Sequence, residues 1–108
     1  MDIKKIIKWF EDNKFEHLGK AQHTISIGNP ALGCDLNEMV RDNYKRMNAV
    51  SYFLYYYQLM EMNIRNYKIY SKPSSYDEET LEIVKEQMYS NYETYINTLE
   101  NIKKINND

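Results

Sequence analysis

The side chains best suited to chemistry in this 108-residue chain are one cysteine and two histidines. Cys34 lies at the predicted start of a helix, where the helix dipole favours a reactive thiolate. His17 and His23 precede it, so the three suggest a Cys–His nucleophilic pair or a metal site. Five and ten residues separate them in turn, whereas structural zinc sites use closely spaced ligand pairs. Cys34 also occupies a position typical of apolar packing against a helix start. We therefore expect no enzyme, no metal and no cofactor.

Basic side chains form two groups on the predicted second helix. Arg41 and Lys45 lie near its start, and Arg65 and Lys68 lie near its end. Tyrosines beside cations can stack on bases, so one alternative is an oligomer that binds a nucleotide-like anion through these four residues. A second alternative is a helical regulator that binds nucleic acid, although the net charge of −2 does not favour it.

Tyrosines are concentrated in the middle of the chain, where seven of the eleven lie between residues 44 and 70. Within Ala49–Met60, only Ser51 and Gln58 are neither apolar nor aromatic. An amphipathic helix normally keeps one polar face, and this segment has almost none. Large side chains therefore project all around the helix, and two neighbouring helices cannot cover them all. We expect an exposed patch that binds a partner or a second copy. The residues predicted to make these contacts are Tyr52, Tyr55, Tyr56 and Met60.

The elements that position these residues follow from the helix breakers. All three glycines and Pro30 lie between residues 19 and 33, and Pro73 is the only breaker after them. This distribution predicts a helix over about 3–18, capped by Asp2 and ended by Gly19, followed by a Gly/Pro-containing loop over 19–34. The loop resembles no phosphate-binding motif, and we expect coil there.

A second helix is predicted over about 36–70, with Asp35 and Glu38 as a capping box. It ends before Pro73, because a residue that precedes proline disfavours helix. One alternative is a break near 63–66, which would give a more globular bundle. If the helix is continuous, the chain must form an elongated hairpin.

A third helix is predicted over about 77–105, after a turn at 71–76. Two capping registers are open, one with Ser75 and Glu78 and one with Asp77. Its apolar residues are spaced 3-4-4-3-4-3, which is typical of a packed seam. Residues 77–108 carry a formal charge of −5 against +2 for residues 35–72, so the two long helices suit antiparallel packing. The predicted seam consists of Leu81, Val84, Met88, Tyr92, Tyr95, Leu99 and Ile102.

The composition indicates one small domain inside a cell. A single cysteine excludes an internal disulfide and suits a reducing compartment. The N-terminus does not resemble a secretory signal, and no apolar run approaches the roughly 20 residues needed to cross a bilayer. Asn, Ile, Lys and Tyr supply 45 residues, and their codons are AT-rich, which suggests a low-GC bacterium or one of its mobile elements.

Together these observations predict an all-α fold of one domain over 1–108: a short N-terminal helix, a loop, and a long antiparallel hairpin that forms a dimer or a higher bundle. The predicted function is a cytoplasmic, non-enzymatic protein-binding module. An inhibitor from a phage or mobile element, or an immunity or antitoxin protein, would suit this description.

Overall fold

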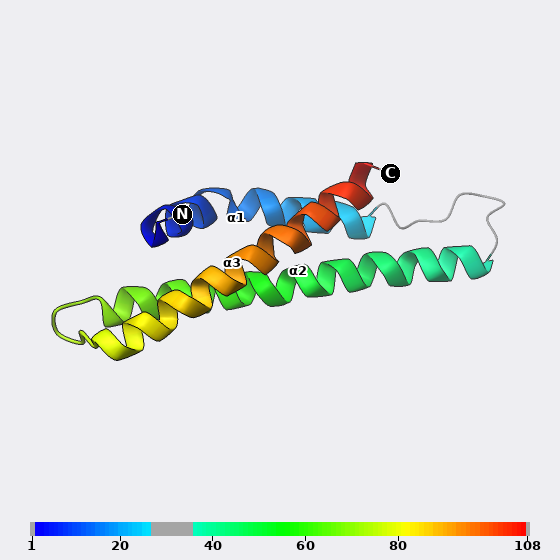
Figure 1. Ribbon diagram of the computed structural model, residues 1–108. Coiled ribbons are helices and arrows are strands. Elements are labelled where there is room, and N and C mark those ends of the chain that lie inside the picture. Colours follow the sequence, from blue (N-terminus) through cyan, green and yellow to red (C-terminus); the bar gives the residue numbers. More distant parts are fainter. Residues whose placement is uncertain (1, 27–35, 108) are drawn as a thin grey trace.

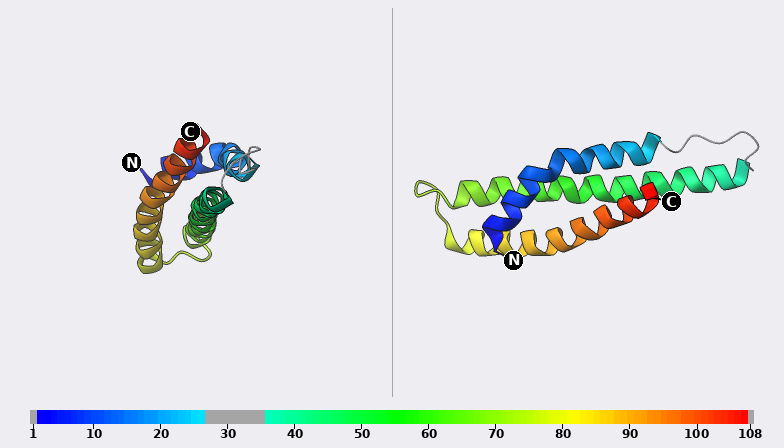
Figure 2. Two further views of the ribbon diagram at one scale, coloured as in Figure 1. Left: turned by 90° about the vertical axis from the view of Figure 1, so that its right-hand side faces the viewer. Right: turned by 90° about the horizontal axis from the view of Figure 1, so that it is seen from above.

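The computed structural model describes residues 2–26 and 36–107, with the backbone alone for 36–40. The described chain forms three helices, which are α1 (Ile3–Ser26), α2 (Leu36–Tyr70) and α3 (Glu78–Asn107). Neither described stretch contains a strand, which confirms the predicted all-α fold. α2 and α3 run antiparallel, and α1 packs on both of them (Figures 1 and 2).

The molecule is elongated because α2 is a single long helix. Its extents are 62 × 21 × 21 Å and its radius of gyration is 17.4 Å, against about 13 Å for a compact domain of similar length. α2 continues through 63–66, so the alternative of a break there is not observed. Asn63 lies inside this stretch, and its side chain is held by Gln87 and Asn91 of α3 at 3.4 and 2.7 Å. The chain therefore forms the elongated hairpin that a continuous helix requires.

α1 begins as predicted and ends later than predicted. The backbone carbonyl of Asp2 accepts hydrogen bonds from the amides of residues 5 and 6, as an N-cap residue does. The helix then passes through Gly19 to Ser26, so the expected end at residue 18 and the loop over 19–26 are wrong. Glycine inside a helix costs about 1 kcal/mol relative to alanine. Burial of Ala21 and Thr24 beyond it offsets that cost.

The extra turns of α1 are fastened to the end of α3. The Thr24 hydroxyl donates to the Asn106 side-chain oxygen at 2.6 Å, and the Asn106 amide donates to the Lys20 carbonyl at 3.1 Å. This contact joins residues more than 80 positions apart, so no local pattern in the sequence could reveal it. The rest of the expected loop, together with Cys34 and the Asp35 cap, lies outside the described residues.

α3 starts at the Asp77 register. The Asp77 carboxylate accepts hydrogen bonds from the Thr80 amide at 3.2 Å and the Thr80 hydroxyl at 3.0 Å. Ser75 instead donates its hydroxyl to the Ile69 carbonyl, which closes the turn after α2. The predicted seam of α3 is buried throughout, apart from the half-buried Tyr92. At the centre of the core, ring centroids of neighbouring aromatic residues lie 5.3–6.0 Å apart. These residues are Phe10, Phe53, Tyr57 and Tyr95.

Candidate protein-binding surface

The inner side of α2 supplies the largest share of the core. Its buried residues recur every three or four positions, as one face of a helix requires. α3 and α1 cover this side, and the tyrosine-rich segment contributes to it through Phe53 and Tyr57. Burial also raises the pKa of the Tyr57 hydroxyl, with a smaller contribution from Glu61. The buried residues of this face are Ala49, Val50, Phe53, Tyr57, Met60, Asn63 and Ile64.

The opposite side of α2 is also largely apolar, and no described element covers it. Tyr44, Tyr52 and Tyr55 remain 68, 65 and 57% exposed, and Met62 and Ile69 remain 44 and 41% exposed. Burying one such side chain would contribute about 1.5–3 kcal/mol, so a row of them, interrupted by the half-buried Leu59 and Asn66, marks a surface suited to binding. We call this row the outer face of α2. It consists of Tyr44, Asn48, Tyr52, Tyr55, Leu59, Met62, Asn66 and Ile69.

The middle of the outer face is hollowed. A shallow depression of about 410 Å³ lies over α2, where the Tyr55 and Tyr56 rings meet edge to face with centroids 5.1 Å apart. Such a depression between aromatic rings can accept an apolar side chain from another molecule. The depression is lined by Asn48, Ser51, Tyr52, Tyr55 and Tyr56.

The predicted contact residues divide between the two sides of α2. Tyr52 and Tyr55 are exposed on the outer face, and Tyr56 is half-buried at its edge. Met60 is fully buried in the core, so it does not belong to this surface. The misplacement arose because apolar residues surround the helix, and their periodicity alone does not say which side the other helices occupy.

Sequence reasoning did not assign six of the outer-face residues to the surface, namely Tyr44, Asn48, Leu59, Met62, Asn66 and Ile69. One pattern could have found all of them except Tyr44. The residues at 48, 52, 55, 59, 62, 66 and 69 are spaced 4-3-4-3-4-3, which is a heptad repeat. The inner face of the same helix carries its own apolar repeat, and the two repeats overlap in the sequence. The overlap conceals the second row until the neighbours of α2 are known.

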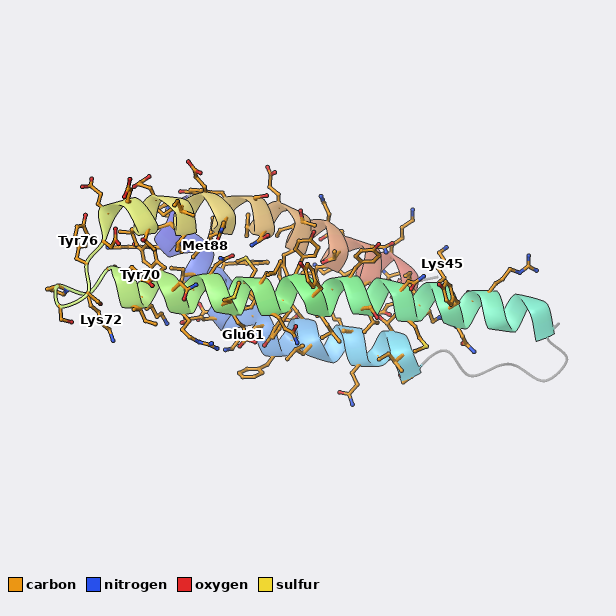
Figure 3. The ribbon with its side chains drawn as sticks, turned by 90° about the horizontal axis from the view of Figure 1, so that it is seen from below. Lys45, Glu61, Tyr70, Lys72, Tyr76 and Met88 are labelled. Carbon is orange, nitrogen blue, oxygen red and sulfur yellow. The ribbon has the colours of Figure 1, made fainter. Side chains whose placement is uncertain are left out.

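The four predicted anion-binding residues do not come together in one site. Arg41 and Arg65 are 24 residues apart on one straight helix, which is about 36 Å. Figure 3 shows Lys45 toward one end of α2 and Lys72 beyond the other. Lys68 forms an ion pair with Glu11 of α1. Two separate groups of cations are therefore present on one chain.

Arg65 and Lys68 border a hollow between α1 and α2 that contains charges of both signs. Its volume is about 240 Å³. Lys14 and Glu61 face each other across it at 3.9 Å, beside the pair formed by Lys68 and Glu11. The acidic partners offset most of the positive charge that an anion would need. The two ion pairs join α1 to α2, and exposed pairs of this kind contribute at most about 1 kcal/mol each.

His17 is buried, and it lies inside α1 because the helix continues past its predicted end at residue 18. Its Nδ1 lies 2.8 Å from the Tyr95 hydroxyl oxygen, and the Trp9 ring centroid lies 5.2 Å from its own. Burial lowers the pKa of His17, and Lys103 lowers it further. Burial also raises the pKa of Tyr95. The pair therefore remains neutral at physiological pH and fastens α1 to α3.

The two histidines lie in different surroundings. His17 is enclosed in the core, whereas His23 is exposed near the end of α1. Cys34 lies outside the described residues. Within residues 2–26 and 36–107, no three side chains of His, Cys, Asp or Glu gather in a way that would hold a metal ion.

The described helices also include none whose length and apolar character would carry it across a membrane. The row of exposed apolar side chains makes the outer face of α2 the most distinctive surface in the described part of the chain. Comparison with protein-family models, with curated proteins and with solved structures finds no match to this chain.

Proposed function

We propose that this protein is a non-enzymatic protein-binding module and that the outer face of α2 is its binding surface. The observation that carries the proposal is the row of exposed tyrosine, methionine and isoleucine side chains along one side of α2. Tyrosine suits such a surface, because its ring buries apolar area while its hydroxyl tolerates a wet rim. Methionine adds a side chain that adapts to different partners.

The two alternative functions have less support. A nucleotide-like ligand bound by one chain would require the cations of α2 to converge, and Arg41 and Arg65 are separated by about 36 Å. The net charge of −2 does not favour a nucleic acid. At the Arg65 end, the acidic side chains of Glu11 and Glu61 stand beside the cations. Among protein-binding modules, the small size and AT-rich codon composition favour a cytoplasmic inhibitor, immunity protein or antitoxin of a phage or mobile element.

The test is a quantitative capture experiment with the full chain. Tagged wild-type protein and a Tyr52→Ala/Tyr55→Ala variant are incubated with host lysate that also contains untagged copies of the chain, and retained proteins are measured by mass spectrometry. Tyr76→Ala is the matched control. Tyr76 is 58% exposed, close to the 57% of Tyr55, but it lies in the turn before α3 and not on the outer face of α2. We expect at least one protein to be retained by wild type and Tyr76→Ala and depleted at least tenfold by the double variant. An identical set of retained proteins for all three would contradict the proposal.

A further inference from the structure

The outer face of α2 has the spacing of a coiled-coil seam. From Asn48 to Ile69, its positions follow one another at intervals of 4-3-4-3-4-3, and Lys45, which lies three residues before Asn48 at the border of this face, continues the repeat in place of Tyr44. This repeat holds a row of residues in line with the axis of a partner helix, so that each side chain packs between residues of the facing helix. The partner that fits the surface is therefore a helix of comparable length. The seam consists of Lys45, Asn48, Tyr52, Tyr55, Leu59, Met62, Asn66 and Ile69.

The seam is free of charge along its centre. Between Asn48 and Met62, every residue of the seam and of its exposed flank at Ser51 and Gln58 is uncharged. A partner helix with a charged face would lose hydration there and gain no opposite charge in return. A second copy of α2 presents an equally uncharged face, and it meets no repulsion between like charges.

From these features, and resting on the proposed binding surface, we propose that the occupant of the outer face is α2 of a second copy, packed antiparallel. When residue 57 of one helix lies level with residue 57 of the other, each residue of the seam faces another residue of the seam. Tyr55 then faces Leu59 of the second copy, and Tyr52 faces Met62, which gives a sulfur–aromatic contact. Asn48 faces Asn66 of the second copy at both ends. A pair of amides inside such a seam fixes its register, as buried asparagines do in coiled coils.

The antiparallel direction follows from the charges at the ends of the seam. A parallel pair would place Lys45 against Lys45 of the second copy and would align two helix dipoles of about 35 residues each. In the antiparallel pair, Lys45 instead lies against Ile69, where its aliphatic stem can cover apolar surface while its ammonium group stays in water. Arg65 lies beside Ser51 of the second copy, and the two copies of Arg65 are far apart.

The size and accessibility of the outer face also fit a second copy. The seam extends over 25 residues, from Lys45 to Ile69, which is about 36 Å of helix. Tyr52 and Tyr55 each expose somewhat more than half of a tyrosine's roughly 150–250 Å², and the exposed parts of Met62, Ile69 and the polar flank extend the area toward the roughly 800 Å² per partner of a standard interface. Seen along the helices, α1 and α3 lie on other sides of α2, so a second α2 can approach without meeting them (Figure 2).

Cysteine crosslinking in solution tests both the partner and its direction. In a Cys34→Ser background, Asn48→Cys and Asn66→Cys proteins are treated with a short bis-maleimide separately and as an equal mixture. The antiparallel pair places residue 48 beside residue 66 of the second copy, whereas two copies of residue 48 are about 27 Å apart. We expect crosslinked dimer in the mixture and at most a tenth as much with either protein alone. Efficient crosslinking of each protein alone would overturn the antiparallel register.

Sedimentation velocity over a hundredfold range of concentration completes the test. We expect a monomer–dimer equilibrium in which Tyr55→Ala weakens association at least tenfold, while Tyr76→Ala leaves it unchanged. A strict monomer at every concentration would overturn the second copy as occupant. If the double tyrosine variant then still lost a captured protein, the proposed binding function would stand without this inference. A dimer that tolerated Tyr55→Ala, together with an unchanged set of captured proteins, would contradict both.

Discussion

The Nδ1 atom of His17 lies 2.8 Å from the hydroxyl oxygen of Tyr95, and both side chains are buried between α1 and α3. They are 78 residues apart in the sequence. The contact joins α1 to the seam of α3, and Trp9 packs against both rings. The position of α1 on the hairpin therefore depends on a polar pair enclosed by aromatic side chains.

This pair predicts that the protein loses stability in mildly acidic solution. In the unfolded chain, His17 binds a proton near its ordinary pKa of 6.5, whereas burial lowers its pKa in the folded protein. Between these two values the unfolded state binds more protons, so the free energy of unfolding falls as the pH drops below about 6.5. The slope is at most about 1.4 kcal/mol per pH unit for one group. Urea denaturation at pH 5–8 measures it.

The matched variants are His17→Phe and His23→Gln. His17→Phe should flatten the pH profile between pH 5 and 7, and His23→Gln should retain the wild-type slope because His23 is exposed in α1. If the slope persisted in His17→Phe and vanished in His23→Gln, the pH dependence would come from His23, which would contradict this prediction.

Removal of the Tyr95 hydroxyl should destabilise the fold without altering its shape. Tyr95→Phe keeps the ring in the aromatic core and leaves His17 Nδ1 buried without this hydrogen bond. An unpaired buried polar group costs about 1–3 kcal/mol. Chemical denaturation should show a loss of that size for Tyr95→Phe and almost none for Tyr89→Phe, whose side chain is exposed on the same helix. Equal stability of the two variants would mean that the hydroxyl makes no net contribution.

Asn63 should make a comparable contribution to the α2–α3 hairpin. Its side chain is buried, donates to Gln87 and accepts from Asn91. Asn63→Ala removes both bonds, and we expect a loss of about 1–3 kcal/mol in the free energy of unfolding. Asn97→Ala is the control, because Asn97 is exposed on α3, and it should change stability by no more than about 0.5 kcal/mol. A loss for Asn97→Ala as large as that for Asn63→Ala would rule out a specific role for the buried amide.

Gly19→Ala should stabilise the protein. Gly19 lies inside α1 and is exposed, and an added Cβ atom would meet nothing within 4 Å. Alanine favours a helix over glycine by about 0.5–1 kcal/mol, and no clash offsets that gain. A higher melting temperature in circular dichroism would support helix at this position. A lower one would favour the helix end that the sequence suggested at residue 18.

Much of the hairpin was predictable because its limits are set by local chemistry. Pro73 ends α2, Asp77 caps α3, and the regular spacing from Leu81 to Ile102 predicts a seam that the structure buries. Each of these depends on residues that are close in the sequence. The end of α1 could not be predicted from the residues around Gly19. Glycine favours a helix end, but burial of Thr24 against α3 outweighs that preference and the helix continues.

The candidate surface was predictable in kind but not in detail. An apolar row around α2 indicated that one side would be left uncovered, and Tyr52 and Tyr55 lie on that side. Met60 was assigned to the same surface and is buried. The pairing of His17 with Tyr95 depends on how α1 crosses α3, which no spacing within either helix reveals.

The most direct measurement of the central claim compares two methionines on α2. Met60 is fully buried in the core and Met62 is 44% exposed on the outer face, although only one residue separates them. Oxidation by hydrogen peroxide, followed residue by residue by peptide mass spectrometry, reports the exposure of each sulfur. In dilute protein, we expect Met62 to be oxidised at least tenfold faster than Met60. As the concentration of the chain or of a captured partner rises, Met62 should become protected while Met60 remains slow. Equal rates for the two residues, or a Met62 rate that no binding partner changes, would contradict the claim that the outer face of α2 is the binding surface.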